Sequence, residues 1–208
     1  MTAYALERFR AGLGHLKAAR REGLRGADAE QHLLDARAAL ATAMNHAEGA
    51  DDALFAKTHQ ALDETGRLMR THFPRRCRIP FRDGAYFREC PVELGHLRVG
   101  MSIEADVERV RCSVCDGDLL DEDGCPHIEG RTCDGVECFG IVESADIKAV
   151  ALVGRPDFPD ARFTSIGYDV DYLTRQAGRE FTPGTSLLCN ECLSPCTGLN
   201  EFFRDASH

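Results

Sequence analysis

Apolar residues recur at helical spacing through the first third of the chain. The first stripe, at intervals of three and four residues, consists of Leu6, Phe9, Leu13 and Leu16. Two further stripes follow, and their members are Leu33, Ala36, Leu40, Ala43 and Ala47, then Leu54/Phe55, Thr58, Ala61/Leu62, Thr65 and Leu68/Met69. Between stripes stand Gly26-Ala27-Asp28 and Gly49-Ala50-Asp51, where glycine suits a helix end and aspartate caps the next helix. Residues 3–72 are therefore predicted to form three antiparallel helices that end before Phe73-Pro74.

The same region contains five histidines, which are His15, His32, His46, His59 and His72. Two histidines three or four residues apart would present both rings on one helix face and suit a metal ion. No pair among these five has that spacing, so the pattern indicates surface or packing histidines. The alanine-rich helices are predicted to form an oligomerisation or partner-docking element over residues 1–72.

From Cys77 onward helical spacing fades, and aromatic and β-branched residues, proline and glycine become more frequent. The segments that favour short strands are 78–81, 97–103, 107–111, 136–142 and 147–153. Asp-Gly pairs between them indicate turns. The sequence therefore predicts an α+β protein, with a helical hairpin or three-helix element at 1–72 and a small β domain at 73–208.

Cysteine content changes this picture, because the chain of 208 residues has ten cysteines. The apolar stretches are short and interrupted by charge, which predicts no membrane span, and the first ten residues lack the apolar run of a secretory signal. We therefore expect a cytoplasmic protein. Disulfides are rare in that reducing compartment, so the cysteines are predicted to bind metal.

The strongest metal motif is Cys112-Ser113-Val114-Cys115, followed after nine residues by Cys125-Pro126-His127. Two cysteines separated by two residues form a tight turn, and a second pair of ligands completes a tetrahedral zinc site. Cys133 and Cys138 follow closely, and either could replace Cys125 or His127. A zinc module is therefore predicted over residues 112–138.

A second cysteine cluster, Cys189, Cys192 and Cys196, forms a predicted knuckle over residues 189–196. Three thiols need a fourth ligand for a tetrahedron, and the candidates are Cys90, Cys77, Cys133 and Cys138. One or two zinc ions are predicted, with a zinc-linked redox sensor as the alternative because zinc-bound thiolates can be oxidised. Iron–sulfur ligation is less favoured, since the spacing differs from the ferredoxin runs.

Charge is unevenly distributed within the net charge of −9. Residues 67–111 hold 10 basic and 6 acidic side chains, whereas residues 112–208 hold 7 basic and 18 acidic ones. The Arg67–Arg88 run offers an anion-binding patch with Arg75, Arg76 and Arg78 as candidates, but a solvated face explains it as well. The acidic C-terminal half disfavours nucleic-acid binding over the whole surface.

Two stretches resemble the prohead (capsid-maturation) serine proteases of tailed phages. Gly100-Met101-Ser102-Ile103 is similar to their Gly-Leu-Ser-Ile-Gly-Phe strand, and residues 145–153, with Pro156 and Pro159-Asp160-Ala161, are similar to a later segment. The resemblance spans about residues 92–166, with the zinc module as an insertion. It implies a half-barrel of strands and a serine nucleophile at the position of Ser102.

The chain departs from that family around the nucleophile. Glu104-Ala105 replaces the Gly-Phe pair, Ala149 and Ala151 replace a glutamate and a serine, and helices occupy the place of the histidine-bearing strand. His96, six residues from Ser102, is the candidate base, and a hydroxyl without a base is a weak nucleophile.

The leading functional prediction is a non-catalytic zinc-binding adaptor or assembly factor, linked to a phage, a prophage or a defence locus. Its partner would be another protein or a second copy bound through the N-terminal helices. The alternatives are a serine peptidase using Ser102 and His96, a nucleic-acid binder using the Arg67–Arg88 patch, and the redox sensor.

Overall fold

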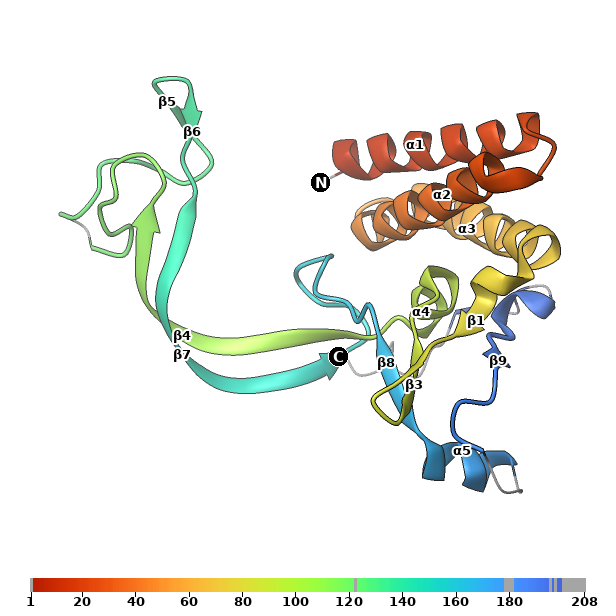
Figure 1. The fold of residues 1–208 in the computed structure, drawn as a ribbon. Helices are drawn as coiled ribbons and strands as arrows, with labels where there is room; N and C mark the ends of the chain where they lie inside the picture. The colour runs from red at the N-terminus through yellow and green to blue at the C-terminus, as the bar shows by residue number, and fades with distance from the viewer. Residues whose placement is uncertain (1, 122, 178–181, 195, 197, 200–208) are drawn as a thin grey trace. The chain divides into compact units, whose positions relative to one another are not determined.

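The computed structural model describes residues 2–121, 123–177, 182–194, 196 and 198–199 (Figure 1). The chain divides into two compact units. We call Met1–Gly100 together with Val153–His208 the helical unit, and Met101–Leu152 the ribbon unit. These bounds differ from the sequence-based division at residue 72, because later segments pack with the helices.

Three long helices open the helical unit, as the apolar spacing predicts. They are α1 (Thr2–Arg21), α2 (Gly26–Ala47) and α3 (Asp52–His72). Figure 1 shows α2 between the other two, and it packs against both. Its buried face contributes Leu33, Leu40 and Met44 to the core. At Gly12 a Cβ would lie 2.6 Å from the Leu40 Cγ, so glycine permits the close approach of α1 to α2.

The two breaks between these helices are built differently. Asp51 caps α3 as predicted, since its carboxylate accepts the Leu54 amide at 2.9 Å. The corresponding prediction for Asp28 is wrong, because α2 already begins at Gly26 and Asp28 lies within its first turn. Gly26 is left-handed as predicted, with φ of 79°, but Gly23, with φ of 68°, takes the left-handed position directly after α1.

Short strands and helices complete the helical unit. A three-stranded antiparallel sheet has the order β2 (Phe81–Arg82), β3 (Ala85–Arg88), β8 (Ile166–Asp169), and β1 (Arg78–Ile79) pairs with β9 (Leu187–Leu188). The helical pieces are η1 (Pro74–Cys77), α4 (Pro91–Leu97), α5 (Val170–Ala177) and η2 (Glu191–Leu193). Strands far apart in sequence thus bring the neighbourhoods of Cys77 and Cys189 together, and the Cys189 amide donates to the Cys77 carbonyl at 2.8 Å.

The segment around residue 97 corrects a sequence-based prediction. Residues 91–97 form α4, so the strand predicted over 97–103 begins only at Gly100. Proline at the first turn of α4 suits a helix start, and Arg98 ends the helix in the left-handed conformation with φ of 51°. The buried Arg98 guanidinium is held there by an ion pair with Glu48 and a hydrogen bond to Asn45 at 2.9 Å.

The ribbon unit is built on one long hairpin of two strands. Predicted strands at 97–103 and 107–111 merge into β4 (Gly100–Cys112), and the last predicted strand is part of β7 (Gly140–Val153). These strands pair along their length in a two-stranded sheet (Figure 1). The turns between them include the short pair β5 (Thr132–Cys133) and β6 (Val136–Glu137).

The mixed helix-and-strand class is confirmed, with helices first and small sheets after them. The described sheets have two or three strands each. Within the described ranges, no helix is long and apolar enough to cross a membrane.

Candidate metal centres

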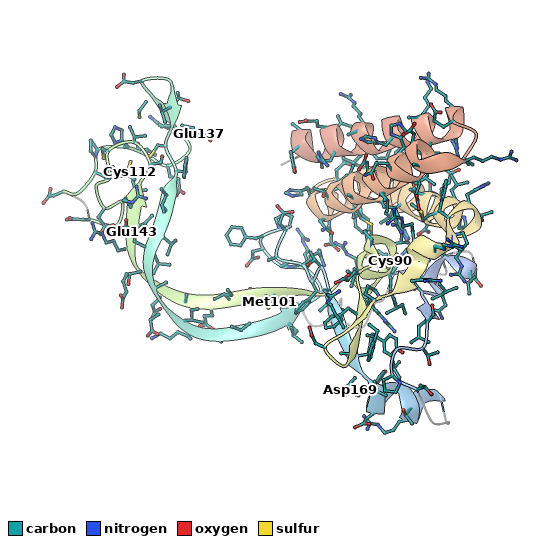
Figure 2. All side chains as sticks on the ribbon, in the orientation of Figure 1. Cys90, Met101, Cys112, Glu137, Glu143 and Asp169 are labelled. Atoms are coloured by element: carbon teal, nitrogen blue, oxygen red, sulfur yellow. The ribbon has the colours of Figure 1, made fainter. Side chains whose placement is uncertain are left out.

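The Cys112–Cys115 turn closes the far end of β4, where Figure 2 labels Cys112. The Asp116 amide donates to the Cys112 carbonyl at 3.0 Å, and Asp116 adopts φ of 60°. The Val114 amide lies 3.4 Å from the Cys112 Sγ. This is the tight turn that the Cys-x-x-Cys spacing predicts, with a backbone amide directed at the thiolate.

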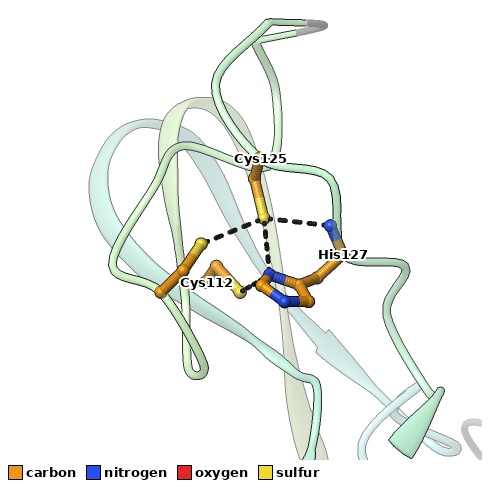
Figure 3. Close-up of side chains that lie close together, drawn as sticks. Cys112, Cys125 and His127 are labelled. Carbon is orange, nitrogen blue, oxygen red and sulfur yellow. Dashed lines mark hydrogen bonds between the residues drawn. The ribbon is translucent and has the colours of Figure 1, made fainter. Parts of the chain in front are cut away.

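Cys125 and His127 come from the following loop and meet this turn (Figure 3). Sulfur to sulfur, Cys115 and Cys125 are 3.4 Å apart, and the His127 Nδ1 lies 3.5 Å from the Cys125 Sγ and 3.7 Å from the Cys112 Sγ. All four ligand atoms lie within 4.8 Å of one another. A tetrahedral zinc ion with three thiolates and one imidazole would separate its ligand atoms by about 3.5–3.8 Å. The four side chains therefore fit a metal ion of that size.

Cys138 approaches the same site, as the sequence left open. Its Sγ lies 3.7 Å from the Cys112 Sγ, and both residues are buried. Cys138 thus remains a candidate for one of the four positions. Cys133 lies on β5, half-buried and outside the group of four.

The surroundings of Cys112 favour its thiolate, which is the form that binds metal. Burial raises the pKa of the Cys112 thiol, but hydrogen bonds from the Val114 and Cys115 amides and from the Cys125 and Cys138 thiols outweigh it and lower the pKa to about 6. In Cys125 and Cys138 burial raises the pKa, and the charge on Cys112 raises it further. One thiolate is thus present near neutral pH, and a bound cation would favour deprotonation of the others.

In the helical unit, the cysteines predicted to form the second metal site lie in two different places. Cys90, at the N-terminal cap of α4, shares a hydrogen bond with Cys189, and this bond lowers the pKa of Cys90. The Arg37 guanidinium, 3.8 Å from the Cys90 Sγ, lowers that pKa further. Burial raises the pKa of Cys192 to about 12, and the negative charge on Cys90 contributes to this rise. Cys77, Cys90, Cys189 and Cys192 thus form one neighbourhood, which we call the thiol cluster.

Cys196, the third member of the predicted knuckle, points elsewhere. Its Sγ lies 3.1 Å from the His96 Nε2 and 3.4 Å from the His59 Nε2. The sequence predicts a packing role for His59, because no second histidine follows it at helical spacing. In the structure, His96 and Cys196 approach it from other elements. The signal that could have found it is the pair His59 and Asp63, which lies four residues apart on α3.

The remaining candidate residues are dispersed. Ser102 lies on β4 in the ribbon unit and His96 on α4 in the helical unit, and the Ser102 hydroxyl makes no hydrogen bond to any described residue. Arg76 pairs with Glu30 at 2.7 Å, while Arg75 and Arg78 are exposed. A further trio, His15, His32 and Asp35, is half-buried and offers three ligand atoms.

Comparison of the chain with models of protein families, with curated proteins and with solved structures finds no match.

Proposed function

We propose that this chain is a zinc-binding protein of non-catalytic type, and that zinc folds its ribbon unit for a role in protein–protein interaction. The observation that carries the proposal is the convergence of Cys112, Cys115, Cys125 and His127, whose ligand atoms lie within 4.8 Å of one another. Thiolates and imidazole favour zinc over calcium or magnesium, which prefer oxygen ligands.

A structural rather than a catalytic zinc fits this ligand set. Four protein ligands leave no open position for water or substrate, whereas catalytic zinc sites keep one. Cys138 stands next to the four as a fourth sulfur, which further favours a closed site. This ligand set supports the zinc stabilisation of the β domain that the sequence predicts.

An interaction role is supported by the face of the β4–β7 ribbon. Side chains of a strand alternate between faces, and the ion pair of Lys148 with Asp106 and the hydrogen bond of Ser144 to Glu108 mark the polar face. On the opposite face, Ile103 and Ile147 are exposed, 58% and 60% accessible, and form an apolar face, whereas nearer the Cys112 end that side of the ribbon carries the ion pairs of Arg109 and Arg111 with Glu143. Two-stranded ribbons are marginally stable alone, so a covering protein would stabilise this one.

The N-terminal helices remain a second proposed docking element. Leu6 and Leu13 of the first apolar stripe are exposed, while Leu16 is buried against α2. Part of the stripe is therefore used inside the bundle, which makes the ribbon face the more strongly supported contact.

The half-barrel and the kinship with prohead proteases also stay proposals. In their favour, the two resembling segments lie on β4 and β7, which pair in one sheet with the zinc module between them. Against catalysis, Ser102 lacks a hydrogen-bonded base among the described residues. Nucleic-acid binding is less favoured, because Arg76, Arg82 and Arg88 pair with glutamates.

Metal content of the purified chain tests the proposal. We expect zinc by elemental mass spectrometry, and we expect Cys115→Ser to lose one equivalent. Cys133→Ser removes a thiol of the same unit outside the group of four and should keep the wild-type content. Equal metal content in both variants and the wild type would refute the site.

The interaction role needs its own experiment. A photo-cross-linking residue at position 147 reports on the apolar face, and one at position 106, on the polar face, is the control. Products specific to position 147 support docking there, and analysis of their mass separates a second copy from a different protein. Equal labelling at both positions would remove this support.

Redox sensing is a second candidate because Cys90 and Cys189 share a hydrogen bond. Peroxide would convert the two thiols to a disulfide, with two waters formed. Under mild peroxide we expect a Cys90–Cys189 disulfide in peptide mass spectra, reversed by added thiol. Unmodified cysteines under those conditions would exclude this role.

A further inference from the structure

A separate group of ligand-type side chains gathers inside the helical unit. His59 and Asp63 lie one turn apart on α3, His96 lies on α4, and Cys196 follows η2. Their ligand atoms all lie within 4.8 Å of one another. Three segments distant in sequence therefore direct two imidazoles, a carboxylate and a thiol toward one point.

The separations are those of ligands around a small ion. The two imidazole Nε2 atoms are 3.0 Å apart, and the Asp63 oxygens lie 2.9 Å from His96 and 3.6 Å from His59. With Cys196 Sγ at 3.1 and 3.4 Å from the same nitrogens, the four atoms enclose a small volume. Zinc bonds of the usual lengths would give ligand–ligand edges of about 3.3–3.6 Å in a tetrahedron.

The orientation of His96 is fixed from outside the group. Its Nδ1 lies 2.6 Å from the Val92 carbonyl oxygen, which can only accept, so Nδ1 carries the proton. In the neutral ring Nε2 then presents a lone pair toward His59, Asp63 and Cys196. A histidine held by a carbonyl at its outer nitrogen is the usual arrangement of a metal ligand.

Burial makes these groups costly without a cation. His96 is 6% accessible and Asp63 9%. The buried Val92 lines the same small pocket as Asp63, His96 and Cys196. A carboxylate and a thiolate in such a place need a positive charge nearby.

We propose that His59, Asp63, His96 and Cys196 form a second metal site that binds a divalent transition ion, zinc in the first place. Two nitrogens, one sulfur and one oxygen suit zinc and exclude calcium and magnesium. The ion fastens Cys196 to α3 and α4. This site is independent of the ribbon-unit site and of the thiol cluster.

Cobalt(II) is the probe, because it substitutes for zinc and can be followed by X-ray absorption. The full-length background Cys115→Ser/His127→Ser disables the ribbon-unit site and removes its imidazole. The thiol cluster contains no histidine, so imidazole scattering from bound cobalt in this background must come from another site.

In that background we expect one imidazole-containing cobalt site per chain. Adding Cys196→Ser or His59→Gln should remove it, whereas the matched controls Cys133→Ser and His72→Gln should retain it. Circular dichroism checks that each variant keeps its helices. The proposal would be overturned if the Cys115→Ser/His127→Ser protein showed no imidazole scattering, or if that scattering persisted in both test variants. Either result would leave the ribbon-unit site untouched, because that site is tested separately by the metal content of Cys115→Ser.

Discussion

The helical unit and the ribbon unit are stabilised in different ways. Buried aliphatic side chains fill the helical unit, including Leu33, Leu40 and Leu62, each 0% accessible. Among the described residues of the ribbon unit, the buried ones are Cys112 and Cys138. The first unit thus has the hydrophobic core that drives folding in water, and the second has a set of candidate metal ligands in its place.

The comparison predicts that folding depends on metal mainly in the ribbon unit. Strands β4 and β7 keep their apolar side chains accessible, so the ribbon unit gains little from burial by itself. In the proposed function, metal binding at its end would supply the missing stabilisation, and a protein partner would add to it. Each prediction below tests whether this contrast between the two units holds.

Metal removal should produce the largest effect. Structural zinc contributes about 10–16 kcal/mol of apparent binding free energy in small zinc domains, and the described part of the ribbon unit has no aliphatic core to replace it. With a strong chelator we expect residues 101–152 to lose protection from hydrogen exchange while α1 and α2 keep theirs. Equal loss of protection in α2 would show that the units depend on metal together.

A cavity in the helical core should have the next largest effect. Leu40→Ala removes a fully buried side chain that packs against Gly12 and should destabilise the helical unit by about 3 kcal/mol. Urea unfolding followed by helical circular dichroism measures this. Ile103→Ala on the exposed ribbon face is the control and should change that transition by less than about 0.5 kcal/mol.

Removing a helix cap should cost less. Asp51→Ala deletes the acceptor of the Leu54 amide and should destabilise the helical unit by about 1 kcal/mol. Asp28→Ala changes a residue within the first turn of α2 and should cost only about 0.3 kcal/mol. Equal unfolding free energies for the two variants would contradict the difference between the two helix breaks.

The smallest effect concerns protons in the metal-free chain. Burial lowers the pKa of His96, but its hydrogen bonds with Asp63 and the Val92 carbonyl, together with the charges of Asp63 and Glu191, outweigh burial and raise the pKa above the ordinary 6.5. Stability from a raised pKa is fully present below the unfolded-state value and is lost as pH rises through the folded-state value. The urea midpoint of the wild type should therefore exceed that of Asp63→Asn most at about pH 6, and the difference should shrink toward about pH 8.

Asp28→Asn is the matched control for this pH series, since Asp28 is exposed. Its difference from the wild type should stay constant over the same range. In the presence of zinc the wild-type trend should reverse, because protons compete with the metal for histidine and thiolate. A difference for Asp63→Asn that grows with pH in the metal-free chain would contradict the ion pair.

Local patterns made part of this protein predictable. The three helices and the capping role of Asp51 follow from apolar spacing and turn residues, which act within a few residues of the chain. The turn from Cys112 to Cys115 is equally local, and its loop partners Cys125 and His127 follow within a dozen residues. Extended strands were predicted in pieces, because β-propensity does not show that two pieces continue through 104–106 as one strand.

Sequence alone therefore determined the helices, the mixed class and the nearby candidate metal ligands, since short loops leave few ways to arrange them. Tertiary structure decided the rest. Packing of α4 against α3 placed His96 beside His59, and the return of the chain after β9 brought Cys189 to Cys90 and Cys196 to the histidines. Contacts between residues so distant in sequence depend on how whole elements pack, and the spacing of side chains along the chain does not predict that packing.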